Sequence, residues 1–345
     1  MEKKVTLQDI AEKVGVSVVS VSKAISGKKG VSADKRLEIL EVAESMGYQK
    51  IKRNIDVSTS NSLNIGIVIS ENYMDEYDSF YLNMYKNLTT AAAMSKNFTL
   101  LEILSEEDEF ALNMPQLIVE SKVDALVIVG KVTNSYMHEL TRKITIPLIC
   151  LDFSYKSDKC ECIISDSFYG SYTMTKYLID LGHRDIAFVG TVLATDSITD
   201  RYLGYVKALM YADIDVNMDW VIPDRHPQVG GINFDKYLKL PNKMPTAFVC
   251  NNDLTASEVI KRLKQKGYSV PGDVSVVGYD NYIFPGISPI EITSYQVDID
   301  RMVAMTLRKI KERLQGQNTS SKISIIEGHL VEKNSAAPLQ KAGEN

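Results

Sequence analysis

The sequence contains few cysteines and lacks the features of exported and membrane-spanning proteins. Among its 345 residues there are four cysteines, and no two of them form a C-x-x-C pair. No apolar run approaches the roughly 18 to 20 residues that a membrane span requires, and residues 1–6 lack the apolar stretch of a signal peptide. We therefore expect a cytoplasmic protein whose cysteines are reduced thiols: Cys150, Cys160, Cys162 and Cys250.

The motifs of metal sites and of common enzymes are also missing. The pair Cys160-x-Cys162 would need other ligands nearby to hold a metal ion, so we expect no metal site. There is no G-x-S-x-G, H-E-x-x-H or P-loop, and no G-x-G-x-x-G after a strand. The four histidines are scattered along the chain. We therefore expect neither enzymatic activity nor a cofactor.

What the sequence does have is an uneven distribution of charge. Residues 1–53 contain 11 Lys and Arg against 7 Asp and Glu, a surplus of four positive charges. The whole chain carries −5, so the remaining residues sum to −9. A basic head on an acidic body is typical of a nucleic-acid-binding module attached to a second unit. The acidic body should repel DNA and confine contact to the head.

The basic head begins with the pattern of two short helices around a glycine turn. Thr6 is a good N-cap, and Asp9 three residues later can complete a capping box. Gly15 permits a reversal of the backbone, and Ser17 can cap a second helix over Val18–Ile25. The pattern predicts a helix-turn-helix, whose second helix lies in the major groove of DNA. The alternative is an ordinary helical hairpin within a larger core.

The outer face of the second helix favours the DNA-binding interpretation. Solvent-exposed helix faces usually carry long Glu and Lys side chains, whereas this face has short hydroxyls, methyl groups and a single cation. Such side chains suit close approach to phosphates and thymine methyl groups. The residues concerned are Ser17, Val18, Val19, Ser20, Ser22 and Lys23.

A basic loop and a third helix complete the predicted head, which spans residues 1–48. Lys28 lies in the loop and is suited to contact the phosphate backbone. The third helix should run from about Ala33 to Met46 and end at Gly47. Its inward-facing residues are expected to be Leu37, Leu40, Ala43 and Met46.

These residues also carry a resemblance to a known family. The run V-T-L-x-D-I-A-x-x-x-G-V-S-x-x-x-V-S-(K/R)-x-(I/L)-(S/N)-G resembles the N-terminal signature of the LacI/GalR family of bacterial transcriptional regulators. The match is long and gap-free, and it continues through Val31-Ser32, Ala43-Glu44 and Gly47-Tyr48. The resemblance implies a head that binds DNA, followed by a hinge and a sensor for a small molecule.

The hinge is expected within a polar linker at residues 49–62. In the family a short helix forms here on DNA and its leucine wedges into the minor groove; Val57 occupies the corresponding position by its spacing from Tyr48. The segment departs from the family pattern at Lys50-Ile51 and at Asn54-Ile55-Asp56, where Asp56 would place a negative charge near phosphates. A plain tether is the alternative.

From residue 63 to 345 the sequence alternates between short apolar strands and helices. The continuous apolar run 65–69 is typical of a strand buried on both faces, and 125–129 and 274–278 are further predicted strands. The alternation predicts an α/β fold with parallel sheets, and it restarts near residue 160, which implies two similar lobes. This resembles the periplasmic-binding-protein fold, with the chain crossing between lobes near 160, 293 and 320.

Polar residues at the carboxyl ends of the predicted strands mark a ligand cleft. The resemblance supports this assignment through Leu151-Asp152, R-x-x-G-Y at 201–205, Asn252-Asp253 and Gly278-Tyr279-Asp280. The alternative is that these residues are helix caps and loop anchors, an interpretation that we favour for Asp253. The candidates for effector contact are Phe80, Tyr81, Asp152, Arg201, Asn252 and Asp280.

The chemistry of these candidates suits a ligand with many hydroxyl groups. Carboxylates accept hydrogen bonds from vicinal hydroxyls, Arg donates in a fixed fork, and aromatic rings cover the apolar face of a sugar. We therefore expect a sugar or a sugar phosphate as effector. The segment 224–228 should contribute as well, and either Arg225 or His226 would favour an anionic group, although exposure to solvent is an open alternative for both.

The sequence thus predicts a dimeric repressor of LacI/GalR type that binds a pseudo-palindromic DNA operator under effector control. Its DNA-binding candidates are Thr6, Ser17, Val18, Val19, Ser20, Ser22, Lys23, Lys28 and Val57. Two alternatives are a regulator controlled by a protein corepressor and a sugar-binding transport protein. The second would predict a signal peptide and no helix-turn-helix, the reverse of the pattern found here.

Overall fold

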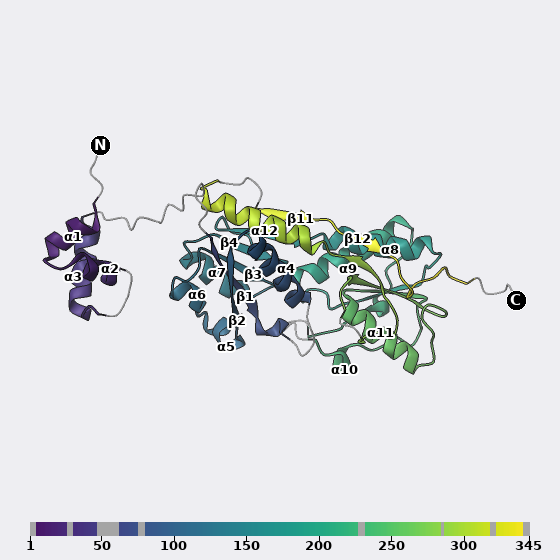
Figure 1. Ribbon diagram of the computed structural model, residues 1–345. Helices are drawn as coiled ribbons and strands as arrows, with labels where there is room; N and C mark the ends of the chain where they lie inside the picture. The colour runs from purple at the N-terminus through teal and green to yellow at the C-terminus, as the bar shows by residue number, and fades with distance from the viewer. Residues whose placement is uncertain are drawn as a thin grey trace. The chain divides into compact units, whose positions relative to one another are not determined.

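The computed structural model describes residues 5–25, 30–46, 62–74, 80–226, 232–283, 286–317 and 322–340 (Figure 1). The chain divides into two compact units, residues 1–61 and residues 62–345. We refer to the first unit as the head and to the second as the body, and each is described by itself. Within the described ranges, no helix is both long and apolar enough to span a membrane.

The head contains three helices: α1 (Leu7–Val14), α2 (Val18–Ile25) and α3 (Ala33–Ser45). At the start of α1 the predicted capping box is present. The backbone N–H of Asp9 donates to Thr6 Oγ1 at 3.3 Å, and that of Thr6 donates to the Asp9 carboxylate at 2.7 Å. Gly15 ends α1 with a φ of 72°, a left-handed conformation that a side chain would resist. This turn sets α2 against α1.

The core of the head differs from the sequence prediction in α3. Ile39 and Ala43 are the buried residues of this helix, and they pack with apolar residues of α1 and α2. Leu37 and Leu40, predicted to point inward, are exposed to 60% and 43%. Ile39 and Ala43 are one helical turn apart and define the buried face, so Leu37 and Leu40 fall on the other side of the helix.

The body consists of two lobes, each built on a six-stranded sheet. The sheet of lobe 1 is entirely parallel, with the strand order β11-β5-β4-β3-β1-β2. Its strands are β1 (Asn64–Ser70), β2 (Phe98–Leu104), β3 (Ala125–Val129), β4 (Leu148–Leu151), β5 (Cys160–Ser165) and β11 (Ile323–Ile326). The helices of this lobe are α4 (Phe80–Met94), α5 (Glu106–Ala111), α6 (Gln116–Val119), α7 (Asn134–Lys143) and α12 (Ile299–Leu314), with a short 3-10 turn η1 (Glu71–Tyr73).

Lobe 2 repeats this design with the strand order β12-β10-β9-β8-β6-β7. Its strands are β6 (Ile186–Val189), β7 (Val221–Ile222), β8 (Ala247–Cys250), β9 (Ser275–Asp280), β10 (Thr293–Gln296) and β12 (His329–Val331). Only β12 is antiparallel to its neighbour among the strands described. The helices are α8 (Ser167–Asp180), α9 (Asp196–Tyr211), α10 (Phe234–Tyr237) and α11 (Asp253–Gln265), with a 3-10 turn η2 (Met218–Trp220).

The chain passes between the two lobes three times. It leaves lobe 1 after β5, returns through α12 after β10, and crosses again between β11 and β12 (Figure 1). The apolar runs of the sequence form the central strands, and every residue of β3, β4, β6 and β8 is buried. The predicted fold, a helical head followed by two lobes with parallel sheets, is confirmed.

Candidate functional site

The exposed face of α2 carries the side chains that the sequence predicts to contact DNA. Val19 is 62% exposed, and Ser22 and Lys23 are also exposed. Val21 and Ala24 are buried beneath them against α1 and α3. The exposed surface of α2 is therefore small and partly apolar, and contact of these side chains with DNA is still a prediction.

Ser17 and Ser20, like Thr6 at the start of α1, are predicted DNA contacts that have a structural role as well. The Ser17 hydroxyl accepts a hydrogen bond from the backbone N–H of Ser20 at 3.1 Å, and the two hydroxyls lie 2.9 Å apart. Ser17 therefore caps α2, which explains a serine at this position without reference to DNA. Lys28 and Val57, two further predicted contacts, lie outside the described residues.

A cavity of about 440 Å³ lies between the lobes of the body. All six residues that the sequence predicts to contact an effector line this cavity: Phe80, Tyr81, Asp152, Arg201, Asn252 and Asp280. Phe80, Tyr81 and Asp152 come from lobe 1, and the other three come from lobe 2. The carboxyl ends of the strands in both sheets thus face one space, as the rule for parallel sheets requires. Whether these residues bind an effector is still a prediction.

Arg201 is the central cation of the cavity. It lies on α9, and only 6% of its surface is exposed. Its Nη1 donates to the backbone carbonyl of Asn251 at 2.6 Å, and its Nη2 lies 3.7 Å from Asp280 Oδ1. The guanidinium also lies 3.8 Å from the centre of the Tyr279 ring. Its Nε is buried and has no hydrogen-bond partner among the described residues.

Two aspartates from opposite lobes complete the charged centre. Asp152 follows β4 and Asp280 ends β9; both have a left-handed backbone, with φ of 67° and 97°. Burial raises the pKa of Asp280 to about 7, although the nearby Arg201 lowers it. Burial also raises the pKa of Asp152, against the opposing effects of Arg201 and of a hydrogen bond from Tyr81. Two buried carboxylates that share one arginine resist being ionised together.

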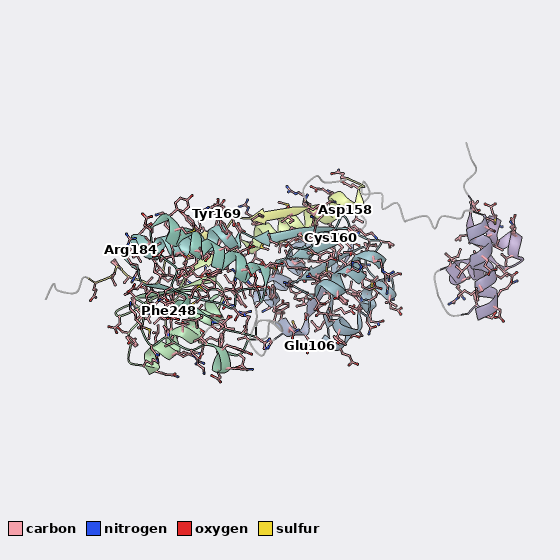
Figure 2. All side chains as sticks on the ribbon, turned by 180° about the vertical axis from the view of Figure 1, so that it is seen from behind. Glu106, Asp158, Cys160, Tyr169, Arg184 and Phe248 are labelled. Atoms are coloured by element: carbon pink, nitrogen blue, oxygen red, sulfur yellow. The ribbon has the colours of Figure 1, made fainter. Side chains whose placement is uncertain are left out.

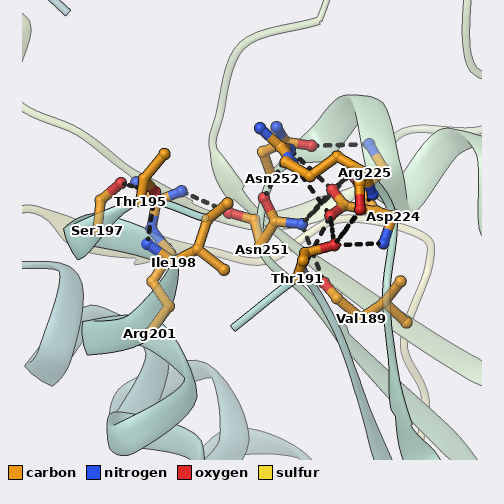
Figure 3. A network of polar contacts seen from close by, with 11 residues as sticks. Val189, Thr191, Thr195, Ser197, Ile198, Arg201, Asp224, Arg225, Asn251 and Asn252 are labelled. Carbon is orange, nitrogen blue, oxygen red and sulfur yellow. Dashed lines mark hydrogen bonds and ion pairs between the residues drawn. The ribbon is translucent and has the colours of Figure 1, made fainter. Parts of the chain in front are cut away.

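A dense buried network surrounds Asp224, two residues after β7 (Figure 3). The guanidinium of Arg225 donates to both Asp224 oxygens, at 3.1 and 2.7 Å. Asn251 Nδ2 and the Thr255 hydroxyl donate to Asp224 Oδ2 at 2.8 and 3.0 Å, and the backbone N–H of Thr191 donates to Oδ1 at 3.0 Å. Burial would raise the pKa of Asp224, but Arg225 and these hydrogen bonds lower it overall.

The structure corrects the interpretation of Asp253 as a helix cap, whereas Asn252 is the cap and also lines the cavity. Asn252, predicted to contact the effector, is the N-cap of α11, and its side chain accepts from the Thr255 N–H at 2.8 Å. Asp253, interpreted as the cap, is already the first helical residue and is buried. Its carboxylate accepts from the Ser294 hydroxyl at 2.7 Å and from the Tyr282 N–H at 2.9 Å. Gly278 is required beside it, since a Cβ there would lie 2.0 Å from Asp253 Oδ1.

Aromatic rings form one wall of the cavity. The rings of Phe80 and Tyr81 lie 5.5 Å apart at the start of α4, and Tyr73 lies 4.5 Å from Tyr81. Across the cavity, Tyr282 of lobe 2 meets Phe80 edge to face, with ring centres 6.5 Å apart. An ion pair of 3.5 Å between Lys131 and Asp196 also joins the two lobes at this cavity. Contacts at the cavity therefore join the two lobes.

Several of these cavity residues could not be selected from the sequence. Asn251 stands beside Asn252 in the chain, and only the start of α11 decides which side chain enters the Asp224 network. Tyr282 follows β9 in a segment without periodicity. For Arg225 the sequence left two alternatives, contact with an anionic group of the ligand or exposure to solvent. The side chain lines the cavity, but its charge is already paired with Asp224.

The fold and the cavity define a class of protein: a helix-turn-helix head joined to a two-lobed, ligand-binding body. Comparisons with known proteins agree. Residues 6–50 match the family model of bacterial regulatory proteins of the lacI family, and residues 175–336 match the periplasmic binding protein-like domain.

Relatives in sequence and in structure cover almost the whole chain. The HTH-type transcriptional repressor PurR of Glaesserella parasuis serovar 5 (strain SH0165) is 28% identical over 316 residues, which cover 91% of each chain. The PurR repressor of Actinobacillus pleuropneumoniae serotype 3 (strain JL03) is 27% identical over 342 residues, covering 97% of this chain and 99% of the relative.

Two solved structures share the fold at lower identity. A complex of the transcriptional regulator CelR with cellobiose is 20% identical, with a TM-score of 0.67, and the match covers 96% of this chain and all of that one. The lac repressor dimer bound to operator and the anti-inducer ONPF is 21% identical, with a TM-score of 0.62, and the match covers 97% of this chain and 100% of that one. Together, the two family models and these relatives support a regulator of the LacI/GalR family. The matches support effector-controlled transcriptional regulation by a DNA-binding repressor, and the homologues are transcriptional repressors, not enzymes.

Proposed function

We propose that the effector of this regulator is a neutral carbohydrate, bound in the cavity between the lobes. The observation that carries the proposal is the arrangement of Asp152, Asp280 and Arg201 around one space beside the aromatic wall of Phe80 and Tyr282. Carboxylates accept from pairs of hydroxyl groups and the Arg fork donates to others. Aromatic rings cover the C–H face of a sugar ring. The volume of about 440 Å³ suits a mono- or disaccharide.

The charge of the cavity favours a neutral sugar over a sugar phosphate. Its lining includes five carboxylates, on Glu71, Asp152, Asp196, Asp200 and Asp280, against the three cations Lys131, Arg201 and Arg225. Each of these cations already has an acidic partner: Asp196 for Lys131, Asp280 for Arg201 and Asp224 for Arg225. A phosphate would therefore find no unpaired cation among the described residues that line the cavity.

The relatives give limited support to this effector class. The structures that share the fold include the CelR–cellobiose complex and a LacI family regulator from Enterococcus faecium with bound ribose, which matches with a TM-score of 0.66 at 21% identity over 80% of this chain and all of that one. Both ligands are uncharged sugars.

Calorimetry with the full-length protein tests the effector class. A panel of neutral mono- and disaccharides, each paired with its phosphate ester, should include a neutral sugar that binds more tightly than its phosphate. The sole tryptophan, Trp220, belongs to an apolar cluster of lobe 2 outside the cavity lining and is a poor optical reporter. The variant Asp152→Asn should weaken binding, and Asp215→Asn, an exposed change in lobe 2, should not. Tighter binding of phosphate esters throughout the panel would refute the proposal.

We further propose that the exposed face of α2 contacts a pseudo-palindromic operator in the cytoplasm. Val18 and Val19 would contact base edges, Lys23 a guanine or a phosphate, and the serines of this face phosphates. Fluorescence polarisation on operators selected from random duplexes measures this. If Lys23 contacts a phosphate, Lys23→Ala should lower the slope of log K against log salt by about 1. Lys35→Ala, on α3 outside the helix-turn-helix, is the matched control.

Dimerisation is proposed to use the free edge of the lobe 1 sheet. β2 is the last strand of this sheet, and it exposes Phe98 to 63% and Ile103 to 40%. Nearby in sequence, Met94 and Phe110 are 83% and 92% exposed. An exposed apolar edge of this kind marks an interaction surface. Phe98→Asp with Phe110→Asp should give a monomer in sedimentation equilibrium, and a dimer that persists in this double variant would place the interface elsewhere.

The alternative of a protein corepressor makes a different prediction. If no small molecule of the panel binds, yet operator affinity rises in the presence of a purified partner protein, the cavity would not be the regulatory input. If a sugar changes operator affinity in the absence of any partner, the cavity is sufficient for control.

A further inference from the structure

Three buried cysteines lie together in lobe 1. Cys150 on β4 is directly paired in register with Cys162 on β5, and Cys160 lies two residues earlier on the same strand. Side chains two residues apart in a strand share a face of the sheet. The three Sγ atoms all lie within 4.8 Å of one another. The sequence shows only the pair Cys160-x-Cys162, and the fold brings in the third thiol.

The cluster lies beneath the loop that joins β4 to β5. Cys150, Cys160 and Cys162 are 0%, 0% and 1% exposed and belong to the apolar core beside α7. The Tyr155 N–H in this loop donates to Cys162 Sγ at 3.3 Å, and the Tyr155 carbonyl lies 3.5 Å from both Cys160 Sγ and Cys162 Sγ. Figure 2 shows Cys160 next to Asp158 of the same loop, in the lobe opposite Phe248.

The geometry points to a site for one soft metal ion with three sulfur ligands. A thiolate–metal bond of about 2.3 Å places three sulfurs of a planar trigonal site about 4 Å apart, and the observed limit of 4.8 Å needs only a small contraction. No His, Asp or Glu joins the group within the described residues, so a four-coordinate zinc site lacks its fourth side chain. Thiolate ligands select soft ions. We propose that Cys150, Cys160 and Cys162 bind a single Cu(I) ion.

The surroundings supply a path to the site and positive charge near it. The covering loop exposes Lys156, Asp158 and Lys159, so local opening of this loop gives access without unfolding of the sheet. Its carbonyl at Asp158 accepts from Arg313 Nη2 at 2.9 Å and from Lys322 Nζ at 3.4 Å. These two cations also pair with the buried Glu161. Binding releases the thiol protons, and the Tyr155 N–H remains as a donor to the Cys162 thiolate.

The test uses the reduced full-length protein under anaerobic conditions. Cu(I) is supplied as its bicinchoninate complex, and transfer to the protein is followed by loss of the colour of that complex. We expect one Cu(I) per chain, with sulfur-to-copper charge-transfer absorption in the ultraviolet. Each of Cys150→Ser, Cys160→Ser and Cys162→Ser should weaken binding by at least about tenfold, since even indirect ligand contacts cost that much. Cys250→Ser, a buried cysteine in lobe 2, is the matched control and should bind like the parent.

A second measurement does not depend on variants that could fail to fold. X-ray absorption of the copper-loaded parent protein should show three sulfur neighbours at about 2.3 Å. Failure to remove Cu(I) from bicinchoninate would overturn the proposal. So would equal loss of binding in Cys250→Ser, or a coordination shell dominated by nitrogen or oxygen.

Discussion

The two lobes of the body share one sheet design, yet they meet the cavity differently. In lobe 2, Asp224 is held by a bidentate arginine and three further donors, and Arg201 is fixed on Asn251 and Tyr279. In lobe 1, Asp152 has the Ser165 hydroxyl at 3.5 Å and a hydrogen bond from Tyr81. Lobe 2 is thus a preorganised half-site, and lobe 1 adds fewer and weaker contacts. A ligand would be positioned by lobe 2 and enclosed by lobe 1.

The largest expected effect is a loss of stability when Asp224, the central residue of the lobe 2 network, is replaced. Asp224→Ala leaves the Arg225 guanidinium without its carboxylate and removes the acceptor of Thr191, Asn251 and Thr255. Removing one partner of a buried ion pair costs about 3 to 5 kcal/mol. Urea unfolding followed by circular dichroism should show this loss in free energy of unfolding, whereas exposed Asp215→Asn in the same lobe should change it little. A loss below about 1 kcal/mol would mean that lobe 2 is not organised around Asp224.

The next effect concerns binding rather than stability. Arg201→Lys keeps the charge, but an ammonium group cannot reproduce the planar guanidinium against Tyr279 together with its contacts to Asn251 and Asp280. Effector affinity measured by calorimetry should fall by about 2 to 5 kcal/mol, the usual cost at a buried charged contact. Arg184→Lys, whose guanidinium contacts the Ala212 carbonyl on the exposed side of lobe 2, is the control. Equal effector affinities for the two variants would mean that Arg201 does not contribute to effector binding.

A smaller effect is expected from a change of pH, because the ionisation of Asp280 should affect both stability and effector affinity. Its pKa of about 7 lies above the ordinary value for aspartate, because burial disfavours the charged form. The folded state therefore retains this proton up to about pH 7, and the contribution of the group to stability is present at low pH and is lost as the pH rises toward 7. Effector affinity should instead increase as the pH rises, since hydroxyl groups and Arg201 need the ionised carboxylate as acceptor.

Lowering the pH from 8 to 6 should thus weaken effector binding by up to about tenfold. The variant Asp280→Asn should bind more weakly at pH 8 and lose this dependence, and calorimetry at three pH values measures both. A dependence that survives in Asp280→Asn would assign the titration to another group.

The contrast between the lobes also explains what the sequence could and could not predict. Buried parallel strands are recognisable in a sequence as apolar runs. The polar residues that follow such strands lie at a common edge of the sheet, so Asp152 and Asp280 could be placed in a cavity from the sequence. The Asp224 network was only partly visible, because β7 is two residues long and gives no recognisable pattern. β10 and β12 are not predicted either, because β10 has the mostly polar sequence Thr-Ser-Tyr-Gln and β12 is only three residues long.

Neighbouring polar residues were the other source of error. Asn252 and Asp253 differ by one position, and the exact start of α11 decides which side chain caps the helix and which is buried. In the head, Leu37 and Leu40 were placed inward, but Ile39 defines the buried face of α3. In each case the local sequence pattern predicts the helix correctly, and tertiary packing determines which of its side chains are buried.

The smallest effect should come from lobe 1, and it tests the comparison most directly. Tyr81→Phe removes the hydroxyl that donates to Asp152 but keeps the ring between Tyr73 and Phe80. The loss of one such hydrogen bond is worth about 0.5 to 1.5 kcal/mol, so effector affinity should fall by only about threefold to tenfold. Tyr85→Phe, on the same helix and outside the cavity lining, is the control. If Tyr81→Phe instead weakened binding as much as Arg201→Lys, the two lobes would share the ligand equally, and the order of positioning by lobe 2 and enclosure by lobe 1 would have to be abandoned.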